Sequence, residues 1–399
     1  MARKWGEHNC NAPPELFNSM FDFIEEQQIQ YDMVFWLGDN PGHAYYAYKR
    51  EDVLNSVQIV ADIIRKRVKE HIPVYPVIGN HDIFPMNEEL FEEPGEQNLI
   101  DIGEIFSVFL GEEESRSFNE YGYYTTLYKD TKLRIIVLNT NFYMVFNMAA
   151  WKFLADPSPQ ISWLVDTLLK AEEEEEKVIL LSHASPGGLE TSHDHDIWIN
   201  KIMERFGHII RTHQAGHYHT DLLHIHRHSE TQEEVGVTWS NGFMTTQDYS
   251  NPNFKIIEFS SVGLEEGAAP EYSLFEAHKY YFDLEGSYKV DVPLWKKEYS
   301  FLEHFQVKNL SPSSLLELLE EAKENEDTAI KLLTTLHNSG PKTVGITCDQ
   351  QCRLKLYCEW SNAVLHHARD CQNIPRFYIP YDHPYYQYRV LLGRALVQK

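Results

Sequence analysis

The feature that most constrains the fold is a set of short apolar segments, each of which runs into residues able to bind a metal ion. The first, "MVFWLGDNPGH" at residues 33–43, passes from a strand-like sequence into Asp39 and then His43. Three later segments end in the same way, at Asn80 with His81, at His183, and at His217 with His219. Because ligands of α/β proteins bind beyond the carboxyl ends of the strands, we expect these side chains to meet at one edge of a sheet.

Stretches with helical periodicity precede three of these segments, at residues 15–28, 51–70 and 160–176. Helices that alternate with short buried strands are typical of a largely parallel sheet covered on both faces. Other segments predict antiparallel or edge strands added to this sheet. They lie at residues 122–130, 133–142, 237–246 and 254–261.

The pattern changes after residue 292, where helices predominate. The clearest predicted helix covers residues 311–337, because Ser311 can cap its first turn and leucines recur at helical spacing. We therefore expect two domains, a large α/β domain at residues 1–292 and a small helical domain at residues 293–399.

Composition restricts the class of ligand. The 399 residues are 43% hydrophobic, which is enough for a large core, and no apolar run approaches the roughly 18 residues of a membrane-spanning helix. The formal charge of -25 would repel phosphate backbones, which argues against a nucleic-acid duplex as partner. An anionic ligand would therefore need a bound cation that reverses the charge locally.

Four of the five cysteines, Cys348, Cys352, Cys358 and Cys371, lie close together near the C-terminus, and Cys10 stands apart. They could form a zinc site, but their spacing lacks the usual Cys-x-x-Cys pairs and no histidine pattern completes it. Two short disulfides, Cys348 with Cys352 and Cys358 with Cys371, fit better and indicate an oxidising compartment. The "NLS" sequence at Asn309, a glycosylation pattern, points to the same compartment.

Taken singly, an aspartate after a strand is usually a turn or helix cap, and a lone histidine is usually a packed side chain. Taken together, carboxylate, amide and imidazole groups suit zinc, manganese or iron, whereas calcium prefers oxygen ligands and structural zinc prefers thiolates. A carboxylate can bridge two ions, and two ions about 3.5–4 Å apart can clamp a phosphoryl group during in-line displacement. We expect Asp39 to be that bridge and His43 to act on the substrate.

The motifs "GDN", "GNHD", "SH" and "GHYH" resemble those of calcineurin-like metallophosphoesterases. Longer segments resemble the acid sphingomyelinase and acid sphingomyelinase-like phosphodiesterase family over nearly the whole chain. They include "WGEHNCNAPPELFNSMFDFI", "PVYPVIGNHDIFP", "LRIIVLNTNF" and "CDQQCRLKLYC". This resemblance implies an α/β sandwich of two mixed β-sheets flanked by helices, with a site for two Zn²⁺ ions at its edge and a small helical C-terminal domain that carries disulfides.

The resemblance also implies a role for each candidate residue. Asp39 matches the bridging aspartate, while Asn80, His183 and His217 match the other ligands of the second ion, and His219 matches a ligand of the first ion. Two further histidines match residues that bind the phosphate and protonate the leaving group, namely His43 and His81. An imidazolium suits this role because it is both a proton donor and a cation.

The chain departs from the family at one point, since it has no counterpart of the strand whose Asp-x-His motif completes the first metal site. That site would keep only Asp39 and His219, too few for tight zinc binding, and sheet backbone would be left unpaired. An N-terminally incomplete chain explains the missing strand, the missing signal peptide and the odd Cys10 together. The alternatives are a catalytically silent pseudoenzyme that acts as a binding protein, and an enzyme whose "SHDHD" segment, residues 192–196, supplies substitute ligands.

We therefore expect a metal-dependent phosphodiesterase that hydrolyses sphingomyelin, or a related phosphodiester or nucleotide, by in-line attack of metal-bound hydroxide. Tyr45, Tyr46 and Tyr48 could line a pocket for the headgroup or base, or could simply pack in their loop. The expected location is secreted or lysosomal and endosomal. The expected state is a monomer with peripheral contact to membrane lipid.

Overall fold

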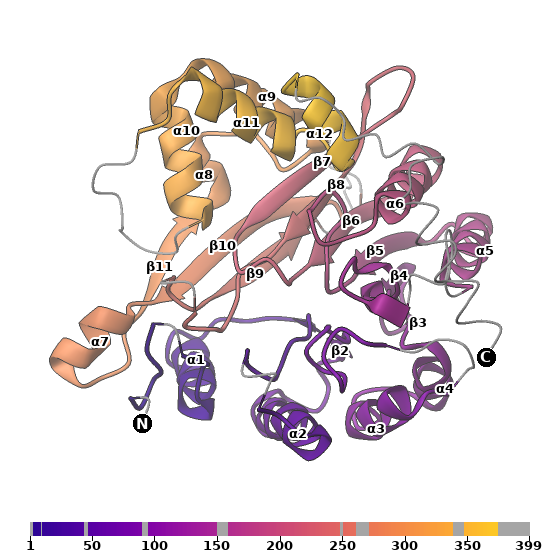
Figure 1. Ribbon diagram of the computed structural model, residues 1–399, viewed down its shortest axis with the longest axis vertical. Coiled ribbons are helices and arrows are strands. Elements are labelled where there is room, and N and C mark those ends of the chain that lie inside the picture. The colour runs from indigo at the N-terminus through magenta and orange to yellow at the C-terminus, as the bar shows by residue number, and fades with distance from the viewer. Residues whose placement is uncertain are drawn as a thin grey trace.

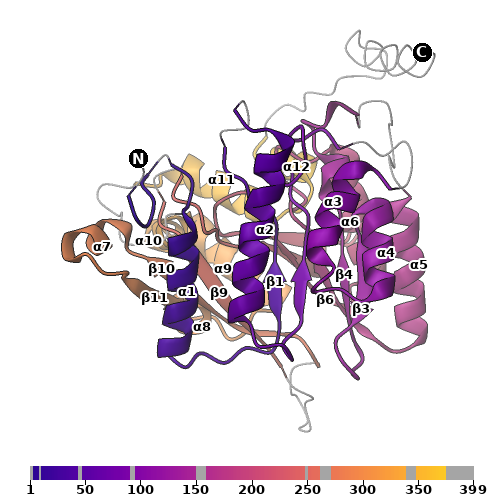
Figure 2. The ribbon, with the colours of Figure 1, turned by 90° about the horizontal axis from the view of Figure 1, so that it is seen from below.

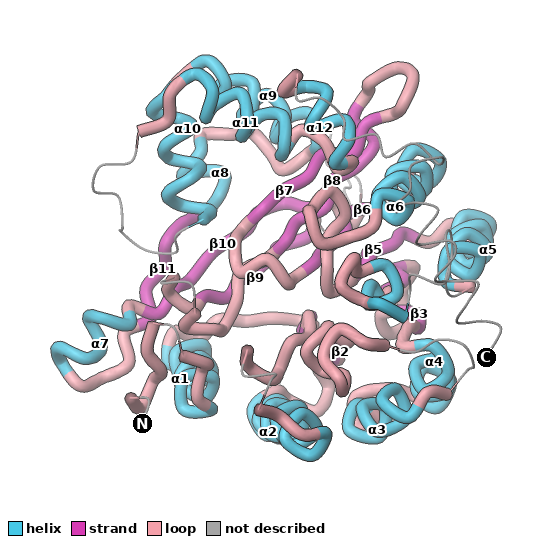
Figure 3. Tube along the Cα trace, in the orientation of Figure 1, coloured by secondary structure: helices cyan, strands magenta, loops and turns pink. Residues whose placement is uncertain are grey.

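The computed structural model of the protein describes residues 3–8, 10–43, 47–89, 95–149, 159–247, 250–260, 271–337 and 347–373. Within these residues the strands form three sheets of six, three and two strands, with helices packed around them (Figures 1 and 3). Among the described residues, no helix is both long enough and apolar enough to cross a membrane.

The six-stranded sheet is mixed. Its strands are, in spatial order, β3 (Tyr124–Leu127), β4 (Leu133–Val137), β5 (Lys177–Leu181), β6 (Ile210–Ala215), β8 (Glu234–Ser240) and β7 (Leu222–Arg227). The four inner strands run parallel, and β3 and β7 pair antiparallel at the two edges. The parallel sheet with antiparallel additions is thus confirmed, although two of the strands predicted as additions, β4 and β8, are inner strands that pair in parallel with β5 and β6.

Both faces of this sheet are buried. Alternate residues of its strands point to opposite sides, and each side packs in its own core. Ile135 and Ile179 face one core, whereas Ile136 and Leu180 face another. The second core is closed by two helices, α5 (Gln160–Glu173) and α6 (His193–Phe206). Nearly continuous apolar sequence in β4 and β5 is what burial on both faces requires.

The second layer comes in two parts. β1 (Val34–Trp36) and β2 (Val74–Pro76) form a parallel pair, and β9 (Asn253–Phe259), β10 (Leu274–Phe282) and β11 (Trp295–Ser300) form an antiparallel sheet. Within the part of the chain that the structure describes, no strand joins β1 to β9. Figure 2 shows four helices side by side along this layer: α1 (Pro14–Glu26), α2 (Arg50–Arg67), α3 (Gln97–Phe106) and α4 (Glu112–Tyr121).

Most of the remaining helices lie toward the C-terminus. They are α7 (Leu284–Val290), α8 (Phe301–Phe305), α9 (Pro312–Glu324), α10 (Glu326–Leu332), α11 (Gln350–Trp360) and α12 (Leu365–Cys371), and a π-helical turn follows α10 at Leu333–His337. A 3-10 helix at Thr140–Tyr143 lies earlier, after β4. The single helix predicted for residues 311–337 is wrong in length. Ser311 caps α9 as expected, but Asn325 interrupts the run, since its side chain accepts the N–H groups of Asp327 and Thr328 and starts α10.

The C-terminal helices pack on the six-stranded sheet, where Leu315 and Leu319 share a core with Ile225 and Trp239. The two predicted disulfides, Cys348 with Cys352 and Cys358 with Cys371, are both present. Cys10 is half-buried and forms no disulfide with any described cysteine. The division of the chain into two domains between residues 292 and 293 stays a prediction. The strands β10 and β11, which lie on either side of this point, pair with each other.

Candidate metal centre

The candidate site lies where β1, β2, β5 and β6 end, as the sequence predicted. Asp39 follows β1, Asn80 and His81 follow β2, His183 follows β5, and His217 follows β6. The first two turns approach so closely that a Cβ atom at Gly38 would lie 2.6 Å from the backbone nitrogen of Gly79. Only glycine fits there, so the two loops can converge on one point.

Several candidate ligands have left-handed backbone, which non-glycine residues seldom adopt. The φ angles are +61° at Asp39, +73° at His217 and +50° at His219. Each such conformation costs about 1–3 kcal/mol and persists where the surrounding structure enforces it, which is common at functional sites.

A buried carboxylate, Asp82, joins the first two loops. Its Oδ2 accepts the N–H groups of Asp39 at 2.9 Å and Gly79 at 2.7 Å, and its Oδ1 accepts the backbone and side-chain N–H of Asn40 at 2.8 and 2.9 Å. Burial, and then the charge of Asp39, raise the pKa of Asp82. The hydrogen bonds from Asn40 and Gly79 oppose that rise, and the four bonds together fix the backbone that presents Asp39.

Four polar atoms converge in front of these loops. The Nε2 atom of His183 lies 2.9 Å from Oδ2 of Asp39, 3.0 Å from Oδ1 of Asn80 and 3.1 Å from Nδ1 of His217. The opposite ring nitrogen of His183 donates to the carbonyl of Leu37 at 2.6 Å, which leaves Nε2 directed at the cluster. A proton on Nε2 of His183 could be donated to only one of its three neighbours, Asp39, Asn80 or His217. A cation could be bound by all four groups.

The electrostatics of the cluster favour a cation. Burial raises the pKa of Asp39, but the charges of His183 and His81 outweigh it and hold that pKa well below its usual range. Burial lowers the pKa of His183 and the charge of Asp39 raises it, with a net rise, while burial lowers the pKa of His217. A carboxylate, an amide oxygen and two imidazoles are a donor set that fits a divalent transition metal.

The other three candidate histidines form a second group beside the first. The ring of His43 packs edge-on against His81, with centroids 4.7 Å apart, and against His219, with centroids 5.4 Å apart. The Nε2 atom of His81 lies 4.0 Å from Oδ2 of Asp39, so the two groups adjoin. All seven predicted residues are therefore brought to one region, and their individual roles remain predictions.

No residue of the "SHDHD" segment belongs to the group of described residues that could share an ion. Ser192 caps α6 and the next four residues form its first turn. His195 stacks on Tyr143, and buried Asp196 accepts the hydroxyl of Thr191. Among the described residues, the carboxylates, histidines and cysteines close enough to share an ion are Asp39, His183 and His217.

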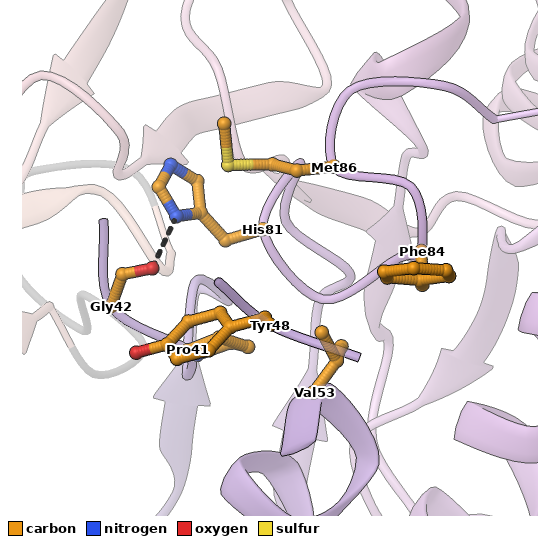
Figure 4. Close-up of a pocket in the computed structure, with 7 residues that line it drawn as sticks. All are labelled: Pro41, Gly42, Tyr48, Val53, His81, Phe84 and Met86. Carbon is orange, nitrogen blue, oxygen red and sulfur yellow. Dashed lines mark hydrogen bonds between the residues drawn. The ribbon is translucent and has the colours of Figure 1, made fainter. Parts of the chain in front are cut away.

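A small hollow opens beside His81 (Figure 4). Its walls are Pro41, Gly42, Tyr48, Val53, His81, Phe84 and Met86. The Nδ1 atom of His81 lies 3.4 Å from the carbonyl oxygen of Gly42 at its rim. Of the three tyrosines that follow His43 in the chain, Tyr48 lines the hollow, and Tyr45 and Tyr46 lie outside the described residues.

Sequence reasoning missed two carboxylates in this region. Asp82 stands inside the "GNHD" motif, where its spacing to Gly79 could have indicated a turn cap. Glu190 lies 2.5 Å from Nε2 of His217, and its position in the chain carries no recognisable signal.

Comparison with known proteins agrees with this geometry. Residues 8–221 match the calcineurin-like phosphoesterase family, and residues 245–374 match the acid sphingomyelin phosphodiesterase C-terminal region. The first match covers more than half of the 399 residues.

Three similar proteins illustrate the relationship. Sphingomyelin phosphodiesterase B of Dictyostelium discoideum is 26% identical, and the match covers 93% of this chain but only 58% of that protein. Human acid sphingomyelinase-like phosphodiesterase 3b is 26% identical, with 90% and 79% covered. A human cyclic GMP-AMP phosphodiesterase is 24% identical, with 95% and 83% covered. The chain therefore belongs to the calcineurin-like phosphoesterase family, and it carries the C-terminal region typical of acid sphingomyelin phosphodiesterases.

Proposed function

We propose that this protein is a metal-dependent phosphodiesterase of the acid sphingomyelinase type. The observation that carries the proposal is the convergence of Asp39, Asn80 and His217 on Nε2 of His183, at 2.9 to 3.1 Å. The family membership supports it, because phosphoesterases of this family act through divalent metal ions.

In this proposal Asp39, Asn80, His183 and His217 hold the second ion, and Asp39 with His219 contributes to the first. Zn²⁺ is the proposed metal, since imidazole and carboxylate ligands suit it. When bound, such ions neutralise phosphoryl charge and activate water for in-line attack. Asp39 serves as the bridge because its backbone is fixed by Asp82 and its carboxylate stays ionised.

His81 and His43 have the proposed task of binding the phosphate and protonating the leaving oxygen. His81 is 7% exposed, and its backbone N–H donates to Oδ1 of Asp39 at 2.8 Å, which sets the imidazole beside the bridging carboxylate. The backbone of His43 is held by the side chain of Asn11 at 3.0 Å. General acid catalysis needs such a donor within hydrogen-bond reach of the leaving group.

The proposed substrate is sphingomyelin or another phosphodiester, including nucleotides. The similar proteins are named for sphingomyelin and for cyclic GMP-AMP, both of which contain a phosphodiester. Tyr48, Phe84 and Met86 line the hollow beside His81, and we propose that a substituent of the substrate lies against them. We further propose a monomer that contacts membrane lipid only peripherally.

The proposed location is secreted or lysosomal and endosomal. Disulfides persist in oxidising compartments, and both predicted disulfides are present. Asn309 of the glycosylation pattern is exposed just before α9. We also propose two domains, at residues 1–292 and 293–399.

A catalytically silent binding protein is the second candidate. It is favoured by the composition of the first metal site, because among the described residues no group of three carboxylates, histidines or cysteines that could share an ion includes His219. The test is metal content per chain of the purified protein, together with hydrolysis of bis(4-nitrophenyl) phosphate at acidic and neutral pH. Bound metal with turnover supports the enzyme, whereas bound metal or empty protein without turnover supports the silent protein.

A further inference from the structure

Glu190 lies on the side of His217 opposite the convergent cluster. Its Oε2 atom is 2.5 Å from Nε2 of His217, while Nδ1 of the same ring is 3.1 Å from Nε2 of His183. The two nitrogens of an imidazole point in divergent directions, so the carboxylate and the cluster engage different nitrogens of one ring. The His217 side chain is 8% exposed and the Glu190 side chain 38%, which places Glu190 at the rim of the site.

The backbone around Glu190 is tied to a neighbouring segment. Its carbonyl accepts the N–H of Val145 at 2.8 Å, and Thr191 forms a β-bridge with Met144. The preceding turn includes Gly187 with φ of +85°, where a Cβ atom would lie 2.3 Å from Nδ1 of His224. The carboxylate is therefore presented to His217 by a segment with its own anchors and not by a free loop.

We propose that Glu190 is a positioning residue of the metal centre, which accepts the Nε2–H of His217 and thereby keeps the Nδ1 lone pair directed at Asp39, Asn80 and His183. The inference rests on the proposed function and extends it to a residue outside the ligand set. A neutral imidazole carries one proton, and the partner of the protonated nitrogen decides which nitrogen can bind a metal. Carboxylates in this position orient the ring and raise its basicity as a ligand.

The inference is tested by metal titration of the metal-free protein and its Glu190→Ala and Glu190→Gln variants. With Zn²⁺, Glu190→Ala should bind about 10- to 100-fold more weakly than the wild type. Glu190→Gln should lose less, because its amide oxygen can still accept the Nε2–H. The matched control is Leu189→Ala, which removes a 69% exposed neighbour in the same segment and should leave the affinity unchanged.

Two spectroscopic readouts separate a positioning role of Glu190 from direct coordination of the metal. In the metal-free protein above pH 7, nitrogen NMR should show the Nε2–H tautomer of His217 in the wild type and a mixture of tautomers in Glu190→Ala. The absorption bands of the Co²⁺-loaded protein should keep their positions in Glu190→Gln, because the proposed ligand set is unchanged. Shifted Co²⁺ bands would make Glu190 a direct ligand and overturn the positioning role.

Failure of this inference can be told from failure of the proposed function. Wild-type protein that binds Zn²⁺, with Glu190→Ala within twofold of its affinity and the same tautomer, overturns the inference alone. Wild-type protein that binds no metal overturns the proposed metal centre. The inference then falls as a statement about a metal site, even if the tautomer shift confirms the hydrogen bond.

Discussion

Asp82 and Asp39 are joined by a hydrogen bond that runs from the backbone of one to the side chain of the other, with Asp39 N–H 2.9 Å from Oδ2 of Asp82. The same oxygen accepts the N–H of Gly79, so one buried carboxylate connects the end of β1 to the end of β2. Since Asp39 has left-handed backbone, this bond opposes relaxation of the loop that carries the proposed bridging ligand.

The first prediction concerns Asp82→Asn. Each carboxylate oxygen of Asp82 accepts two N–H groups, so an amide nitrogen in either place would face two donors. We expect the free energy of unfolding to fall by about 1–3 kcal/mol, and metal affinity to fall with it. Urea denaturation measures the first effect. Asp101→Asn, which alters a partly exposed carboxylate bonded to Arg50, is the control and should cost less.

The second prediction separates metal binding from catalysis. His217→Ala removes one of the convergent nitrogens and should lower the metal content per chain. His43→Ala removes a ring that packs beside the cluster without joining it, so the metal should stay while turnover of a phosphodiester falls about 10²- to 10⁴-fold. Elemental analysis and a hydrolysis assay give both quantities. Loss of metal from His43→Ala would contradict the division of roles.

The sequence predicted the ligand cluster well because each candidate ends a strand, and parallel strands bring their carboxyl ends together. The places of Asp39, Asn80, His183 and His217 after strand-like segments were sufficient for that inference, whereas their roles as ligands came from the family resemblance. Glu190 could not be predicted in the same way, because it reaches His217 through a hydrogen bond between segments 27 residues apart that have no common periodicity. Asn325 was missed for a different reason, since the leucine pattern continues across it and only its capping bonds interrupt the helix.

The third prediction concerns the two disulfides. In the chain-entropy description, a cross-link stabilises by restricting the unfolded chain, and the effect grows with the loop it closes. Cys358 and Cys371 are 13 residues apart, and Cys348 and Cys352 only 4. We expect the free energy of unfolding to fall by about 3 kcal/mol when Cys358 and Cys371 are both replaced by serine, and by about 2 kcal/mol when Cys348 and Cys352 are. Denaturant unfolding of the two variants under non-reducing conditions gives the order, and a reversed order would show that packing and not loop length decides it.

The fourth prediction concerns pH. Burial lowers the pKa of His213 to about 3 and that of His224 to about 4, from an ordinary value of 6.5. His213 is neutral in the fold, between the hydroxyls of Ser182 at 2.8 Å and Thr238 at 3.0 Å. Below pH 6.5 the unfolded chain binds protons that the folded chain excludes, so stability is complete above pH 6.5 and falls as the pH drops toward these lowered values.

Each such histidine contributes at most about 1.4 kcal/mol per pH unit within this window. The His213→Gln variant keeps a polar side chain but has no proton to gain, so its unfolding free energy should depend less steeply on pH between about 4 and 6.5. Urea denaturation of the metal-free proteins at several pH values measures the two slopes, and the difference between them isolates His213 from other titrating groups. Equal slopes would mean that His213 is protonated in the fold, against the burial that the structure shows.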